Sequence, residues 1–407
     1  MYIKRKIEYD ILKYLHRPEI IALIGPRQCG KTTVLKKIYC SLSDAVFLTF
    51  EDQQVLSMFE NNIKQFIAVY LADKKYVFID EFQYAKNGGK LLKYIYDLHH
   101  TKIIISGSSA IDLTVKAIKF LVGRIFVLNM LTLDFYEYLS FKNPNDARFY
   151  KKNKIDLKFG QKFNPITKQI KTLNDHFEEY AIWGGYPQVV LSKDSTEKIE
   201  ILKNIYNTYF LREVKDILGL IDDYKLSRLI KSLALQIGNM VEYGELSRVS
   251  ELSFTTLKKQ LNFLSKTYIS ELIRPFYKNK RKEIVKNRKV YFYDTGLRNF
   301  IINDFRSLSV RPDNGFLLEN ACWMQLLKNG FEVQYWRDKN KNEVDFIINL
   351  GEGKIAAMEI KYQRAKCRKL PLAFTDNHPE AMAYCFYMVG DKIKKNVDES
   401  FLPLPLI

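Results

Sequence analysis

The chain has 407 residues, more than one ordinary hydrophobic core supports, so we expect two to four domains. Hydrophobic residues make up 47% and charged residues 27%, which is typical of a folded protein and excludes an intrinsically disordered one. Lys and Arg number 64 against 46 Asp and Glu, a net charge of +18. Such an excess attracts polyanions, although a lysine-biased genome explains it equally well.

The five cysteines contain no C-x-x-C pair and have no matching histidine cluster; they are Cys29, Cys40, Cys322, Cys367 and Cys385. We therefore expect reduced thiols, and neither a disulfide framework nor a zinc site. No apolar run approaches the roughly 20 residues that cross a bilayer, and the first residues lack the apolar core of a signal peptide. These features predict a cytoplasmic protein with no membrane partner.

The first third of the chain alternates short apolar runs with segments of helical length. The runs are Ile20–Ile24, Ala45–Phe50, Tyr76–Asp80, Lys102–Ser106 and Ile125–Met130. Because β-rich runs alternate with helix-length segments, the pattern predicts the α/β class and a parallel sheet.

A phosphate-binding motif follows the first run. The sequence Gly25-Pro26-Arg27-Gln28-Cys29-Gly30-Lys31-Thr32 fits G-x-x-x-x-G-K-[ST] and precedes a predicted helix at Thr33–Ser41. The glycines let main-chain N–H groups and the helix N-terminus face the phosphates. Lys31 is expected to reach the β- and γ-phosphates of ATP, and the Thr32 hydroxyl to bind Mg²⁺. Thr33 completes the predicted nucleotide-binding segment.

Polar residues at the ends of two later runs fit ATP hydrolysis. Asp80 is expected to bind Mg²⁺, and Glu81 to orient and deprotonate the attacking water. Ser106 is predicted to sense the γ-phosphate, with Ser108 as the alternative. Arg124 is either an arginine finger for a neighbouring subunit or a surface arginine.

Residues 153–156, Asn153-Lys154-Ile155-Asp156, match the N-K-x-D signature of GTPases, but they lie in a lysine-rich segment and not after a buried strand. We therefore expect adenine and not guanine nucleotides. That basic segment, Lys142–Lys171, is interpreted as a surface excursion within a helical region that extends to about Leu220.

Three helices and two strands are predicted next, at Leu226–Met240, Glu245–Leu252, Thr255–Tyr268, Ile269–Tyr277 and Lys289–Tyr293. This order, with a basic connection between the strands, is the pattern of a winged helix. We expect DNA phosphates to contact Thr255, Lys258, Lys259 and Gln260 on the third helix, and Lys280, Arg281 and Lys282 at the wing tip. The alternative is a helix that packs between domains and a solvated basic hairpin.

The last stretch opens with a helix at Phe316–Asn329, followed by strands at Val333–Trp336, Glu343–Leu350 and Lys354–Tyr362. Glu359 and Lys361 share a face of their strand, because side chains alternate. With Asp345 and with Glu319 on the helix, they predict a Mg²⁺ or Mn²⁺ site that hydrolyses phosphodiesters. A surface salt bridge on a half-exposed strand is the alternative.

These motifs resemble the archaeal and bacterial predicted-ATPase family in which an AAA+ module precedes a PD-(D/E)XK nuclease-type domain. The resemblance also rests on Gly123-Arg124, Trp183-Gly184-Gly185-Tyr186-Pro187, Tyr293-Asp294-Thr295-Gly296-Leu297 and Glu343-Val344-Asp345-Phe346. It implies a three-layer sheet in which another strand separates the Asp80 strand from the P-loop strand. It also favours Arg124 as the finger of a homo-oligomer.

The predicted domains are the AAA+ core at 1–135, a helical lid with the basic segment at 136–223, a winged helix at 224–294 and an α/β restriction-endonuclease-like domain at 295–407. Together they predict a Mg²⁺-dependent ATPase that binds double-stranded DNA and cleaves it through its last domain. The alternative is a nucleotide-gated switch that binds DNA or protein and has an inactive nuclease-like domain.

Overall fold

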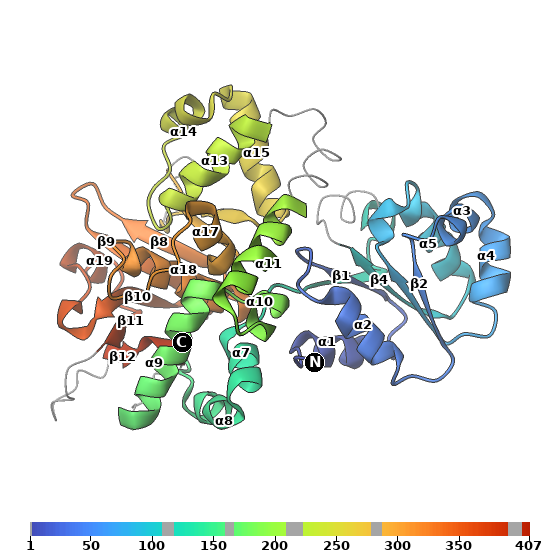
Figure 1. The fold of residues 1–407 in the computed structure, drawn as a ribbon, viewed down its shortest axis with the longest axis horizontal. Helices are drawn as coiled ribbons and strands as arrows, with labels where there is room; N and C mark the ends of the chain where they lie inside the picture. The colour runs from blue at the N-terminus through green and yellow to red at the C-terminus, as the bar shows by residue number, and fades with distance from the viewer. Residues whose placement is uncertain (1, 108–117, 159–166, 209–222, 278–286, 390–400) are drawn as a thin grey trace. The chain divides into compact units, whose positions relative to one another are not determined.

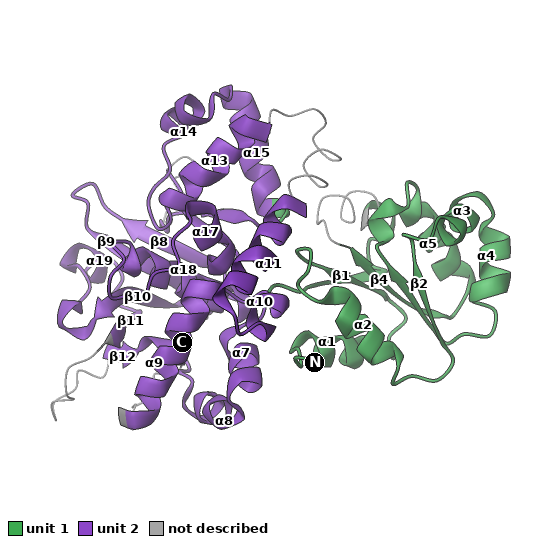
Figure 2. Cartoon of the chain, in the orientation of Figure 1, with its two compact units in different colours: residues 1–132, 266–268 green, residues 133–265, 269–407 purple. Residues whose placement is uncertain are grey.

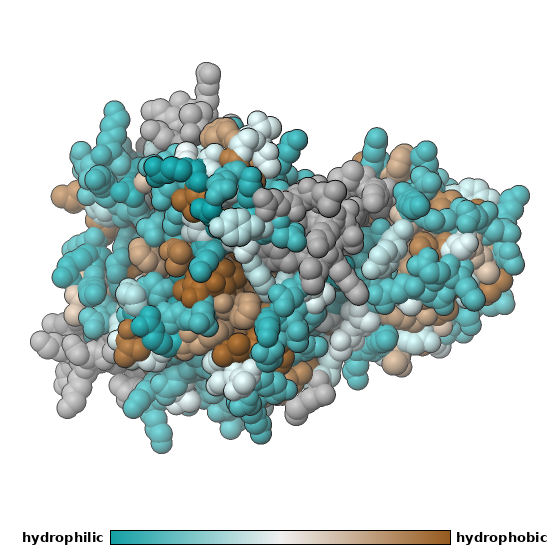
Figure 3. All heavy atoms as spheres, turned by 45° about the horizontal axis from the view of Figure 1, so that its top comes forward, coloured by the Kyte–Doolittle hydropathy of each residue, from teal (hydrophilic) through white to brown (hydrophobic). Residues whose placement is uncertain are grey.

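The structure is a computed structural model that describes residues 2–107, 118–158, 167–208, 223–277, 287–389 and 401–407. Two compact units divide the chain (Figure 2). Unit 1 contains residues 1–132 and 266–268, and unit 2 contains residues 133–265 and 269–407. The described helices include none that is long and apolar enough to cross a membrane. Figure 3 shows mainly hydrophilic side chains on the face it displays.

Unit 1 contains a five-stranded parallel sheet, as the alternation of apolar runs predicts. Its strands are β1 (Ile20–Ile24), β2 (Ala45–Thr49), β3 (Tyr76–Asp80), β4 (Lys102–Gly107) and β5 (Ile125–Asn129). They are hydrogen-bonded in the order β2-β3-β4-β1-β5. The strand β4 therefore separates β3 from β1, which confirms the order that the family resemblance implies.

Helices cover both faces of this sheet (Figure 1). On one face lie α1 (Ile7–Tyr14) and α2 (Lys31–Tyr39), packed on Ile21 and Leu23. On the other lie α3 (Gln53–Asn61), α4 (Ile63–Tyr70) and α5 (Gly88–Leu98), packed on the alternate side chains of β1. Since every residue of β1 is buried, both faces of the strand contribute to the core, as expected for a central parallel strand.

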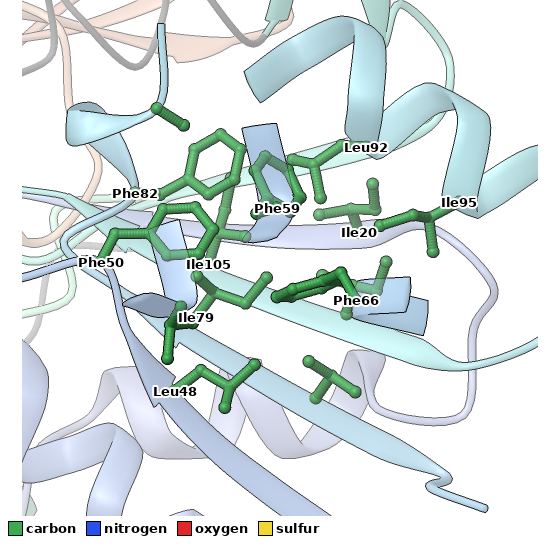
Figure 4. Packing of buried hydrophobic residues seen from close by; sticks show 14 of the residues in the cluster. Ile20, Leu48, Phe50, Phe59, Phe66, Ile79, Phe82, Leu92, Ile95 and Ile105 are labelled. Carbon is green, nitrogen blue, oxygen red and sulfur yellow. The ribbon is translucent and has the colours of Figure 1, made fainter. Parts of the chain in front are cut away.

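Aromatic side chains pack together with aliphatic ones on the second face (Figure 4). The ring centroid of Phe50 lies 4.9 Å from that of Phe59 and 5.4 Å from that of Phe82. Phe82 begins the short helix η1 (Phe82–Tyr84), directly after Asp80 and Glu81. Burial of this ring therefore fixes the turn that presents the two carboxylates.

Unit 2 begins with a helical region: α7 (Phe135–Lys142), α8 (Pro144–Asn153), α9 (Thr167–Trp183), α10 (Pro187–Leu191) and α11 (Ser195–Thr208). The described part of the basic segment is not the surface excursion that its composition predicts. Tyr150 is buried and its hydroxyl donates to the Ile407 carbonyl at 2.9 Å. The Ile155 N–H donates to the Leu406 carbonyl at 2.9 Å. Apolar residues scattered among lysines thus dock this segment on the C-terminal residues.

Next come α13 (Asp223–Leu235), α14 (Tyr243–Ser250) and α15 (Phe254–Lys266), then the antiparallel strands β6 (Ser270–Ile273) and β7 (Lys289–Phe292). These three helices and two strands follow the predicted order, with boundaries that differ by a few residues. The predicted wing tip at Lys280, Arg281 and Lys282 lies outside the described residues.

The C-terminal part of unit 2 is a mixed sheet with helices α17 (Thr295–Ile302), α18 (Asn314–Lys328) and α19 (Leu372–Thr375). The sheet has the order β12-β11-β10-β9-β8. Its strands are β8 (Val333–Arg337), β9 (Glu343–Gly351), β10 (Lys354–Gln363), β11 (Ala381–Val389) and β12 (Phe401–Pro403). Strands β10, β11 and β12 are parallel, whereas β9 is antiparallel to both β8 and β10.

The expectation that all five cysteines are reduced is wrong for one pair. Cys367 and Cys385 form a disulfide, with 6.0 Å between their Cα atoms, and both are buried. Cys385 lies on β11, and Cys367 follows the end of the neighbouring strand β10. Strand pairing between distant segments brings the two thiols together, which spacing along the chain does not reveal.

Two of the glycine-containing motifs lock together inside unit 2. The Gly185 N–H donates to Asp294 Oδ2 at 2.8 Å, and Asp294 also caps α17 by accepting from the Leu297 N–H at 3.1 Å. Gly184 has φ +76, and a Cβ there would lie 2.1 Å from Asp294 Oδ1. The motifs therefore have a structural role in joining α9 to α17.

Gly184→Ala should lower the free energy of unfolding of unit 2 by more than about 2 kcal/mol, because the left-handed backbone and the contact with Asp294 both resist a side chain. Gly353→Ala is the matched control: Gly353 also has φ +76, but a Cβ there would have nothing within 4 Å of it. The Gly353→Ala variant should lower the free energy of unfolding by about 1 kcal/mol. Urea unfolding followed by tryptophan fluorescence measures both, since Trp183, Trp323 and Trp336 are the three tryptophans of the chain and all belong to unit 2. Equal losses in the two variants would contradict the locking role.

Candidate nucleotide-binding site and carboxylate–lysine cluster

The predicted phosphate loop connects β1 to α2. A Cβ at Gly25 would lie 1.9 Å from the Met130 carbonyl oxygen, so only glycine fits between this loop and the segment after β5. Gly30 has φ +100 and caps α2 in a left-handed conformation. The first N–H groups of α2 have no acceptor within the helix, and together with the helix dipole they favour an anion at this position.

Lys31 lies over this loop. Only 6% of the residue is exposed, and its Nζ donates to the carbonyl oxygens of Gly25 at 3.0 Å and Pro26 at 2.8 Å. The ammonium group is thus already held at the phosphate loop by weak neutral acceptors. A phosphate is a stronger acceptor for a cation, so the geometry suits transfer of Lys31 from these carbonyls to a nucleotide.

Arg5 supports the same loop, and the sequence motif does not include it. Its Nη1 donates to the Cys29 carbonyl at 2.7 Å, and its Nη2 donates to the Leu131 carbonyl at 2.6 Å. Arg5 therefore links the phosphate loop to the segment after β5. No local pattern marks this residue, because it lies 24 positions before Cys29 and meets the loop only in the folded chain.

Asp80 and Ser106 meet at the ends of neighbouring strands. The Ser106 hydroxyl donates to Asp80 Oδ1, and both side chains are buried. Ser106 also pairs with Leu23 of β1, so it lies between Asp80 and the strand that leads into the phosphate loop. Carboxylate and hydroxyl oxygens such as those of Asp80 and Thr32 are the ligands that Mg²⁺ prefers, and this donor chemistry fits the predicted metal.

Glu81 follows Asp80 in a left-handed conformation with φ 54. Its Oε2 accepts a hydrogen bond from Gln83 Nε2, and its side chain is half-buried. Because Glu81 comes directly after β3, it lies at the same edge of the sheet as Asp80 and Ser106. Gln83 is a further residue that the sequence did not single out.

Arg124 is not placed beside the phosphate loop of its own chain. It precedes β5, whose first residue pairs with Ile20 at the start of β1, whereas the loop follows the other end of β1. Arg124 Nε contacts Asp97 Oδ1 at 3.2 Å, and both side chains are more than a third exposed. Ser108, the alternative to Ser106, lies outside the described residues.

Arg5→Met should weaken ATP binding about tenfold, because the loop loses two charge-assisted hydrogen bonds to carbonyl oxygens that shape it. Titration with a fluorescent ATP analogue measures the Kd. Arg17→Met is the control, since Arg17 is in the same unit and forms a surface ion pair with Glu19. A Kd for Arg5→Met that equals that of the control would show that the loop does not depend on Arg5.

The predicted carboxylates of unit 2 also lie close together. Lys361 Nζ contacts Asp345 Oδ2 at 3.3 Å and forms an ion pair with Glu359. The same Asp345 oxygen accepts the Ile360 N–H at 2.8 Å. Asp345 on β9 is thereby fixed to both Lys361 and the main chain of β10.

A second lysine, which the sequence analysis did not single out, holds the remaining carboxylate. Lys289 on β7 is 1% exposed, and its Nζ lies 3.0 Å from Glu319 Oε1 and 2.5 Å from Glu343 Oε1. The Tyr291 hydroxyl also donates to Glu319. We call Lys289, Glu319, Glu343, Asp345, Glu359 and Lys361 the carboxylate–lysine cluster.

Burial and mutual charge shift the pKa values in this cluster. Burial raises the pKa of Glu319 to about 7, and burial together with repulsion from Asp345 raises that of Glu359. Burial alone would lower the pKa of Lys361, but Asp345 and Glu359 outweigh it and hold the value above its usual range. The raised pKa of Lys361 keeps the ammonium charged against the carboxylates, whereas the raised pKa values of Glu319 and Glu359 favour their neutral forms.

This arrangement does not fit a resident metal ion. Among the described residues, no group of three or more His, Cys, Asp or Glu side chains is arranged to hold a metal. The predicted ligands Glu319, Asp345 and Glu359 are brought together, but Lys289 and Lys361 contact their oxygens.

One predicted DNA contact is wrong. Thr255, Lys258 and Lys259 are exposed on α15, but Gln260 is only 2% exposed. Gln260 lies three residues after Leu257 and four before Leu264, both of which are buried in the helix face that packs inward. Helical spacing therefore places Gln260 on the apolar face, where it cannot reach a nucleic acid.

Three protein-family models match consecutive parts of the chain. A model described as an AAA domain matches residues 17–139, one described as a domain of unknown function (DUF8612) matches 174–307, and one described as a domain of unknown function (DUF4143) matches 314–407. With the phosphate loop, Asp80 and Ser106 at one sheet edge, the first match identifies an ATP-binding, AAA-type P-loop ATPase domain. The chain is therefore an AAA-type ATPase domain followed by two domains of unknown function.

Two relatives of similar length carry the description of uncharacterized protein. An uncharacterized protein of Methanocaldococcus jannaschii is 27% identical over 362 residues, which cover 86% of this chain and 76% of the relative. An uncharacterized protein of Mycobacterium tuberculosis is 23% identical over 375 residues, or 88% and 74%. Among solved structures, a Walker-type ATPase of Pyrococcus abyssi is 14% identical, with 74% of this chain and 96% of that chain covered and a TM-score of 0.48.

Proposed function

We propose that the protein hydrolyses ATP with Mg²⁺ and uses the nucleotide to control binding of double-stranded DNA. The observation that supports hydrolysis is the meeting of the phosphate loop, Asp80, Glu81 and Ser106 at one edge of the unit 1 sheet. A site that only bound Mg²⁺ and ATP would need Asp80 for the metal but would need no second carboxylate, such as Glu81, beside it.

The residues have separate roles in the proposed reaction. Lys31 leaves the Gly25 and Pro26 carbonyls and contacts the β- and γ-phosphates. Thr32 and Asp80 would hold Mg²⁺, which neutralises charge that develops on the phosphate oxygens. Glu81 accepts a proton from water as the water oxygen bonds to the γ-phosphorus. The bond to the β-phosphate oxygen breaks, and ADP and phosphate leave.

Glu81→Gln should retain ATP binding and lose at least about 100-fold in turnover, because the amide cannot accept the proton from water. Lys31→Ala should instead lose tight ATP binding, because it removes the cation that faces the phosphates. Phosphate release and nucleotide titration separate the two effects. Asp73→Asn is the control, because Asp73 is exposed and lies before the start of β3, at the opposite end of that strand from Asp80. Normal turnover in Glu81→Gln would show that another group is the base.

We further propose that Arg124 acts on the nucleotide of a neighbouring copy. Its place near the start of β5 excludes contact with the phosphate loop of its own chain, which follows the far end of β1. Breaking the exposed ion pair between Arg124 and Asp97 requires little free energy, since a surface ion pair contributes at most about 1 kcal/mol to stability. The proposal therefore requires a homo-oligomer.

For DNA, we propose that the three helices and two strands from α13 to β7 act as a winged helix. The net charge of +18 and the exposed Lys258 and Lys259 on α15 support contact with phosphates. We propose that the nuclease-like C-terminal domain does not cut, because the buried Lys289, which is not part of the predicted site, pairs with Glu319, one of the carboxylates that would bind the metal. Cleavage is the second candidate, since the four predicted residues do lie together.

Binding of a DNA duplex should weaken steeply as salt rises, and the variant Lys258→Gln, Lys259→Gln should reduce the slope of log K against log salt by about 2. Lys151→Gln, Lys152→Gln is the matched control, because both lysines are exposed on α8 in the same unit. The DNA should stay intact with ATP and Mg²⁺ or Mn²⁺. An unchanged slope would remove α15 from the contact, and cleavage that Asp345→Asn abolishes would favour the nuclease.

A further inference from the structure

A groove of about 690 Å³ lies within unit 2, between α15 and the strands β6 and β7. Its walls include Phe254 and Lys258 from α15, Tyr243 from the start of α14, Arg274 just after β6, and Arg288 just before β7. This volume falls in the range of roughly 300 to 1,000 Å³ that ligand pockets occupy. None of the residues that line the groove belongs to the carboxylate–lysine cluster.

The groove is positively charged. Three cations line it, Lys258, Arg274 and Arg288, against one acid, Glu271. Glu271 is already engaged, since it accepts from the Ser265 hydroxyl at 2.5 Å and from the Tyr293 hydroxyl at 2.9 Å. Within the described parts of the chain, neither Arg274 nor Arg288 forms a side-chain ion pair or hydrogen bond. Both guanidinium groups are therefore available for an anion. Arginine binds phosphate well, because two of its N–H groups can donate to two phosphate oxygens in a bidentate arrangement.

An exposed aromatic ring lies at the same groove. Phe254 is 50% exposed, so its ring is accessible to a ligand. Its ring centroid lies 5.9 Å from that of Tyr243 and 4.6 Å from Lys258 Nζ. An accessible ring flanked by cations is the combination with which proteins bind unpaired bases, which stack on the ring while the cations hold the backbone.

We infer that this groove binds single-stranded nucleic acid, with phosphates on Arg274 and Arg288 and a base stacked on Phe254. The inference rests on the proposed nucleic-acid function and names a strand type and a site for it. In a duplex the faces of the bases are covered by their neighbours, so a ring inside a groove reaches only an unpaired base. Exposed lysines of α15 contact a duplex backbone; the groove adds recognition of a displaced or terminal single strand.

The test uses the full chain and a labelled oligothymidylate of about 12 nucleotides, with a duplex of equal length in parallel, both followed by fluorescence anisotropy. Phe254→Leu keeps an apolar side chain and removes the stacking ring, so it should weaken oligothymidylate binding about tenfold and duplex binding less than twofold. Phe316→Leu is the matched control, because Phe316 is a 40% exposed phenylalanine of unit 2 outside the groove.

The variant Arg274→Gln, Arg288→Gln should reduce the salt slope for oligothymidylate by about 1.4, or 0.7 for each phosphate contact. ATP turnover and the unfolding midpoint verify that each variant is folded. If wild type binds the duplex but Phe254→Leu binds oligothymidylate as tightly as Phe316→Leu, the groove inference is wrong and the proposed function stands. If wild type binds neither DNA but binds polyglutamate, both fail and the groove is a site for acidic peptides.

Discussion

In the parallel sheet of unit 1, β4 is hydrogen-bonded between β1 and β3, and this register determines which side chains share an edge. The loop after Ile24, the Ser106 hydroxyl and the Asp80 carboxylate emerge side by side because their strands run in the same direction. A carboxylate buried at this edge must be hydrogen-bonded, and Ser106 meets that need. The same constraint places Arg124 at the opposite edge.

In unit 2 the main constraint is the burial of charged side chains. The carboxylates of its carboxylate–lysine cluster are buried or half-buried, and their charge must be balanced by a metal, by protons or by other side chains. The structure uses Lys289 and Lys361, with a raised pKa at Glu319 and Glu359 as the further adjustment. Lys289 belongs to β7 of the three-helix segment, and Glu319 and Glu343 belong to the C-terminal sheet domain. The cluster thus joins these two parts of unit 2 through the ion pairs of Lys289.

Much of the fold could be predicted because its signals are local. The five apolar runs of unit 1, the phosphate loop and the approach of Asp345 to Glu359 follow from periodicity and strand alternation. The burial of Gln260 was also predictable, because helical spacing places it on the same face as Leu257 and Leu264. The prediction of a DNA contact relied instead on its basic neighbours. Arg5, Lys289 and the Cys367–Cys385 disulfide were not predictable in this way, since each depends on segments that meet only after folding.

We propose that the loop from Gly25 to Thr32 holds the phosphates of ATP. The most direct test is an experimental structure of the protein with Mg²⁺ and a non-hydrolysable ATP analogue. We expect Lys31 Nζ to leave the carbonyl oxygens of Gly25 and Pro26 and to contact the β- and γ-phosphates, with Asp80 at the metal. A nucleotide bound elsewhere, with Lys31 still on those two carbonyls, would contradict it.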